Sequence, residues 1–62
     1  MKIVILDFTG TQVFVADYPS IDSTDPEDFI DQLSYKHDLG VRSANCQWMI
    51  IPDGAPLNIT HL

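Results

Sequence analysis

Three side chains belong to the types that attack substrates or bind transition metals: the thiol of Cys46 and the imidazoles of His37 and His61. A cysteine nucleophile needs a neighbouring base and a third group that orients the base, all held in a cleft. A zinc site needs four ligands, usually at closer spacing than these residues have. A lone cysteine at the start of an apolar stretch is ordinarily a small core residue. We therefore predict no catalytic residue and no enzyme activity.

The densest charge feature is a run of carboxylates on one segment. Its members are Asp22, Asp25, Glu27, Asp28 and Asp31. A calcium loop that began at Asp22 would need glycine at its sixth position and a bidentate glutamate at its twelfth. Glu27 and Leu33 stand at those positions instead. We therefore interpret the run as helix capping and a solvated helix face, and we expect no metal and no cofactor.

The net charge of the chain is −6, with three basic and nine acidic residues. Affinity for phosphate backbones comes from clustered Lys and Arg, so this balance argues against direct binding to nucleic acid. The same charge favours a basic protein as partner. One hypothesis that uses it is an acidic inhibitor, which imitates a nucleic-acid backbone and occupies a basic cleft.

The N-terminus shows no secretory signal, because Lys2 is followed by only four apolar residues before Asp7. No apolar run approaches membrane-spanning length. The single Cys46 cannot form an internal disulfide. We therefore expect a soluble, cytoplasmic protein without membrane contact, and we interpret the glycosylation pattern Asn58-Ile59-Thr60 as accidental.

A chain of 62 residues, of which 45% are apolar, is long enough for one small domain. Its first two strands are predicted over 2–6 and 12–16, where β-branched and aromatic residues are frequent. Asp7-Phe8-Thr9-Gly10 between them matches a type I turn, with Gly10 at positive φ as a bulge residue. This turn would pair Asp7 with Thr11 and Ile5 with Val13.

A second register is open for this hairpin. A two-residue turn at Thr9-Gly10 would pair Lys2 with Asp17 and Leu6 with Val13. We rank this alternative second, because such turns need φ > 0 at their first loop position and threonine resists that conformation. The choice matters, since a slip of one residue sends a strand's side chains to the other face.

A helix is predicted over 26–38. Pro26 suits the first helical position, and Asp25 would then be the N-cap. An apolar stripe consists of Phe29, Ile30 and Leu33. Gly40 fits a left-handed residue at the C-terminal end.

A third strand is predicted over 46–51, and a fourth over 57–61 is an open alternative that must lie at an edge because Pro56 cannot donate to a ladder. The turn Ile51-Pro52-Asp53-Gly54 would separate them. The fold class is therefore α+β, with a three- or four-stranded antiparallel sheet in the order 2-1-3-4. One helix would pack on one face of this sheet.

The face without the helix is the candidate functional surface. We expect Val4, Leu6 and Phe14 on this face, and Trp48 as well if the register of its strand allows. Two interpretations stay open: the chain from Pro52 onward folds across these side chains, or they bind another protein or a second copy. The leading functional hypothesis is a non-enzymatic protein–protein interaction module, which as a homodimer would bind itself. The acidic inhibitor is the alternative.

Overall fold

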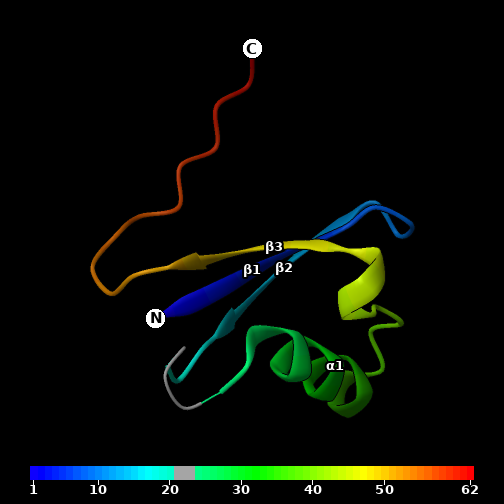
Figure 1. Ribbon diagram of the computed structural model, residues 1–62. Coiled ribbons are helices and arrows are strands. Elements are labelled where there is room, and N and C mark those ends of the chain that lie inside the picture. The colour runs from blue at the N-terminus through cyan, green and yellow to red at the C-terminus, as the bar shows by residue number, and fades with distance from the viewer. Residues whose placement is uncertain (21–23) are drawn as a thin grey trace.

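The computed structural model describes residues 1–20 and 24–62. The elements in chain order are β1 (Lys2–Asp7), β2 (Gln12–Asp17), α1 (Pro26–His37), the short 3₁₀ helix η1 (Ser43–Asn45) and β3 (Gln47–Ile51). The strands form one antiparallel sheet in the order β2-β1-β3, and Figure 1 shows α1 on one side of it. The α+β class and the sheet order 2-1-3 are confirmed.

The register between β1 and β2 pairs Lys2 with Asp17 and Leu6 with Val13. The register that we preferred from the sequence is therefore wrong. The pairing of the alternative is correct, but the strands are joined by the loop 8–11 and not by a two-residue turn at Thr9-Gly10. The reason lies in the loop 8–11, where Thr11 adopts the left-handed conformation at φ 52°. The loop 8–11 is one residue longer than the predicted three-residue turn with a glycine bulge. It therefore shifts the cross-strand partner of every β1 residue by one position.

The carboxylate of Asp7 holds this loop in shape. Its Oδ1 atom accepts hydrogen bonds from the backbone N–H groups of Thr9 and Gly10, both at 3.1 Å. A Cβ atom on Gly10 would collide with the same carboxylate. A side chain at position 10 would therefore displace the carboxylate that accepts from Thr9 and Gly10, which favours glycine here. The sequence had predicted a positive φ at Gly10, but the left-handed residue of the loop is Thr11.

Helix α1 begins as expected. The side chain of Asp25 is the N-cap and accepts from the backbone N–H of Glu27 at 2.8 Å, and Pro26 occupies the first turn. The other end differs from expectation, because the left-handed residue that terminates the helix is Asp38, at φ 54°. Gly40 is also left-handed, at φ 73°, but it lies two residues farther along the chain.

The segment after β3 forms no strand in the structure. Gly54 has φ 82°, and the N–H of Ala55 donates to the carbonyl of Pro52, so the turn lies one residue later than predicted. Residues 52–62 are exposed throughout. Figure 1 shows this segment leaving the sheet on the side opposite α1.

The hydrophobic core joins the helix, the sheet and both long connections. Its buried members are Ile3, Ile5, Tyr18, Ile30, Val41 and Cys46. Tyr18 lies just after β2, and its ring meets Phe29 edge-on with 4.9 Å between centroids. Its hydroxyl donates to the carbonyl of Thr24. The sequence pattern alone does not assign a core role to this tyrosine.

Candidate interaction surface

Alternation along the strands sorts the side chains of the sheet onto two faces. One face carries the core residues Ile3 and Ile5 of β1 together with their cross-strand partners. These partners are Ala16 and Phe14 of β2, and Ile50 and Trp48 of β3. All of them belong to, or pack against, the core cluster that contains Ile30 of the helix. This helix-side face is therefore the inner surface of the domain.

The opposite surface, which we call the open face, is also apolar. It consists of Val4, Leu6, Val13, Val15, Met49 and Ile51, with Lys2, Asp17 and Gln47 at its ends. Val4 is buried at its centre, between its cross-strand partners Val15 and Met49. Large parts of four side chains reach solvent: 40% of Leu6, 57% of Val13, 50% of Val15 and 50% of Met49. Four of the six aliphatic side chains of the open face are thus exposed, whereas Val4 and Ile51 are buried.

A hollow marks the end of the open face next to the hairpin loop. It has a volume of about 280 Å³, and its apolar lining comes from Leu6, Phe8 and Val13. Phe8 is itself an exposed aromatic side chain in the loop. A single apolar side chain of a binding partner could enter this hollow, which is how anchor residues are usually held.

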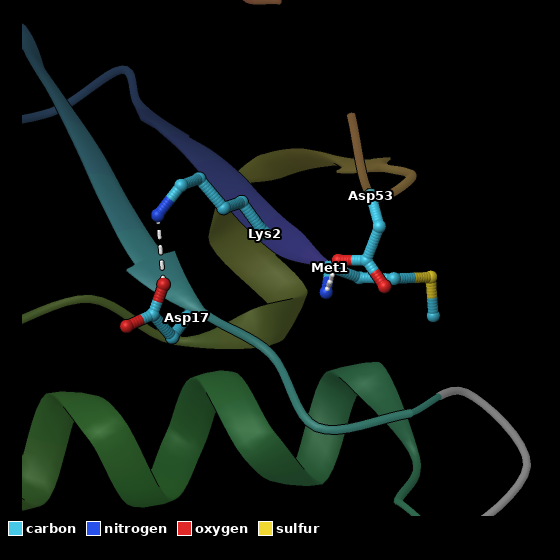
Figure 2. Close-up of polar contacts among 4 residues, drawn as sticks. All are labelled: Met1, Lys2, Asp17 and Asp53. Atoms are coloured by element: carbon cyan, nitrogen blue, oxygen red, sulfur yellow. Dashed lines mark hydrogen bonds and ion pairs between the residues drawn. The ribbon is translucent and has the colours of Figure 1, made fainter. Parts of the chain in front are cut away.

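The other end of the open face is polar and electrically balanced. The ammonium group of Lys2 donates to Oδ1 of Asp17 at 2.7 Å, as Figure 2 shows. This hydrogen bond, together with the positive charge of Lys2, lowers the pKa of Asp17 below its ordinary value. Figure 2 also shows the ion pair between the Met1 ammonium group and Asp53, beyond the end of the strands. The apolar centre therefore has a polar margin.

The four residues expected on the interaction surface lie on two different faces. Val4 and Leu6 are on the open face, whereas Phe14 and Trp48 are half-buried against the core on the helix side. The wrong register explains the misplacement of Phe14. Val13, Val15 and Met49 were missed. The alternative register held the signal for Val13 and Val15, because it pairs Leu6 with Val13 and so places both valines beside Val4 and Leu6.

The thiol and imidazoles show no catalytic arrangement. Cys46 is buried, and this burial raises the pKa of its thiol, with the charges of Asp31 and Asp7 adding to the effect. His37 and His61 are exposed. Among residues 1–20 and 24–62, no three His, Cys, Asp or Glu side chains are grouped closely enough to hold a metal ion. A neutral, buried thiol is a poor nucleophile.

Two carboxylates of the acidic run serve the fold. Asp25 caps α1, and Asp31 accepts from the N–H of Ser43 at 2.9 Å and from its hydroxyl at 3.1 Å. The two hydrogen bonds between Asp31 and Ser43 tie the helix to η1. Glu27 and Asp28 lie exposed in the first turn of α1, where they complement the helix dipole. Asp22 of this run lies outside the described residues, as does Ile21 beside it.

Comparisons with protein families, with curated proteins and with solved structures found no match for this chain. In the part of the chain that the structure describes, no helix has the length and apolar character needed to cross a membrane.

Proposed function

We propose that this protein is a non-enzymatic protein–protein interaction module that binds its partner through the open face. The observation that carries the proposal is the exposure of Leu6, Val13, Val15 and Met49 on one continuous side of the sheet. The largest contiguous apolar patch on the surface of a single domain is often functional. We take α1 to cover the opposite face, which the clustering of Ile30 with Ile3 and Ile5 supports.

The anatomy of the open face suits such a role. Binding surfaces commonly combine an apolar centre with a polar, solvent-accessible margin. Here the aliphatic centre ends at the Lys2–Asp17 pair on one side and at Gln47 on the other. The hollow beside Phe8 offers a place for an anchor side chain. We place the module in the cytoplasm, whose reducing conditions suit the free thiol of Cys46.

The acidic inhibitor remains the second candidate, and the net charge of −6 favours it. Its surface would be the exposed carboxylates of α1, among them Glu27 and Asp28. Asp25 and Asp31 contribute less to this surface, because both already accept hydrogen bonds from the chain itself. Binding through these carboxylates would weaken steeply with salt, whereas binding through the open face would not.

Site-specific photo-crosslinking in the cells that make the protein tests the leading proposal. A benzophenone amino acid would replace Val15 and, separately, Met49. A third variant would carry it in place of Tyr35, whose side chain is 92% exposed on α1 and serves as the matched control. We expect protein adducts at positions 15 and 49 and none at 35. Equal adducts at all three positions, or none at 15 and 49, would contradict the open face as a binding surface.

A further inference from the structure

We propose that the partner of the open face is a second copy of this chain, packed face to face so that the two sheets form the inner layers of a dimer. This inference rests on the proposed function and names its partner. It follows from two features of the described residues: the charge balance of the open face, and the position of the C-terminal segment, which can supply the area that the strands lack.

The open face itself carries no net charge, so a second copy can pack against it although each chain has a net charge of −6. Among the strand residues of the open face, Asp17 is the one acidic side chain, and Lys2 neutralises it. The exposed carboxylates of α1 belong to the layer on the other side of the sheet (Figure 1). Packed sheets lie about 10 Å apart, so the helices of a face-to-face dimer would be separated by well over the screening length of about 8 Å.

The open face also meets the requirement of a twofold interface. Such an interface applies the same surface of both copies to each other, so the surface must be complementary to itself. Aliphatic side chains satisfy this condition, whereas an unbalanced cluster of like charges would not. Val13, Val15 and Met49 supply the aliphatic groups, and the internal Lys2–Asp17 pair leaves no net charge beside them.

Size shows that the strands alone are not enough. Three strands of about six residues cover roughly 20 by 14 Å, or about 280 Å², at ordinary strand spacings. A stable interface buries about 800 Å² on each partner. The missing area must come from segments that stand beside the open face.

The C-terminal segment 52–62 is in the right place to supply that area. It is exposed along its length, it carries the apolar residues Leu57, Ile59 and Leu62, and it leaves the sheet on the side of the open face (Figure 1). An extended segment of this length reaches up to about 35 Å, farther than the roughly 20 Å length of the strands. A copy docked on the open face would therefore meet the segment, and each copy would extend its own segment over the other.

Analytical ultracentrifugation of the full chain, from about 1 μM to about 1 mM, tests the dimer. We expect the average mass to rise toward twice that of the monomer. Val15→Lys and Met49→Lys should each raise the dissociation constant by about 100-fold or more, because either would bury an unpaired ammonium group. The double variant Leu57→Asp/Ile59→Asp should raise it by about 10-fold. Tyr35→Lys, the matched control on α1, should leave it unchanged.

A second measurement removes the ambiguity of a variant that fails to fold. In a mixture of ¹³C-labelled and unlabelled wild-type chains, isotope-filtered NMR should show contacts between the Met49 methyl group and aliphatic groups of the other copy. Contacts that involve only other surfaces, or a dimer that persists in folded Val15→Lys, would overturn the inference.

The two proposals fail in different ways. A chain that stays monomeric at about 1 mM overturns the second copy as partner. If the crosslinks at positions 15 and 49 then join a different protein, the interaction module stands and only its partner was misassigned. If no crosslinks form at those positions, both proposals fail together.

Discussion

The two faces of the sheet are built from the same strands and differ in what covers them. On β1, Ile3 and Ile5 are buried against the helix side, whereas Leu6, on the other face, is exposed. On β2, Phe14 packs toward the core while its neighbours Val13 and Val15 point to solvent. Both faces are apolar, so hydrophobicity alone does not tell the core from the open face. The two faces differ in that one clusters with Ile30 of α1, whereas the other leaves Val13, Val15 and Met49 exposed.

The largest expected contrast is between truncations on the two faces. Ile30→Ala removes a fully buried side chain from the core, so we expect a loss of about 3 kcal/mol in the free energy of unfolding. Val13→Ala on the open face should lose less than about 1 kcal/mol, because its side chain is already half in water. Urea unfolding followed by Trp48 fluorescence measures both at low protein concentration. Equal losses would show that the two faces are buried alike.

A sharper test concerns the loop that sets which residues share a face. Asp7→Ala removes the acceptor for the N–H groups of Thr9 and Gly10, and should reduce the free energy of unfolding by about 1–2 kcal/mol. Asp7→Asn, the matched control, keeps an acceptor oxygen and should lose clearly less. Urea midpoints give the energies, and cross-strand NMR contacts between Leu6 and Val13 report the register. If neither variant changed the register or the free energy of unfolding, Asp7 would not be what holds the loop in shape.

Tyr18 offers a smaller test on the helix side. Tyr18→Phe keeps the edge-on contact with Phe29 but removes the hydroxyl that donates to Thr24. The expected loss is about 1 kcal/mol, the usual net value of one hydrogen bond. Tyr35→Phe on the exposed surface of α1 is the control and should change nothing. Thermal unfolding measures both, and matching midpoints would mean that the Tyr18 hydroxyl contributes no stability.

The smallest effect belongs to the polar end of the open face. Lys2 lowers the pKa of Asp17, so the contribution of this pair to stability is fully present above the ordinary pKa that the carboxyl group has in the unfolded chain. This contribution to stability disappears as the pH falls through the lowered folded-state pKa of Asp17. Lys2→Met should return the pKa of Asp17 toward its ordinary value, as an NMR titration of the carboxyl group would show. Lys36→Met should leave that pKa where it is in the wild type.

The elements that the sequence predicted well are those with local causes. Pro26 and Asp25 define the start of α1 by themselves, and the alternating apolar residues of β1 and β2 define strands. The register of the hairpin could not be decided in the same way. The register depends on a small difference in free energy between loop conformations. The hydrogen bonds of the Asp7 carboxylate and the left-handed conformation of Thr11 favour the longer loop.

The features that the sequence could not reveal depend on distant parts of the chain. The face of Trp48 follows from the pairing of β3 with β1, whose partners are more than 40 residues apart. In the sequence, Tyr18 precedes Pro19 and resembles a linker residue. Its core position becomes evident only from its contact with Phe29 of the helix. The sequence predicted an apolar face on the side without the helix, but the register decides which residues lie on that face. Of the expected residues, only Val4 and Leu6 do.

The central position of β1 has a consequence for the way the chain folds. One neighbour, β2, follows after a short loop, so the hairpin can form as soon as residue 17 has left the ribosome. The other neighbour, β3, does not exist until Ile51 has been added. During that interval one edge of β1 has unpaired amide and carbonyl groups, and such edges recruit strands from other molecules. The nascent hairpin therefore exposes an edge of β1 that the finished fold covers with β3.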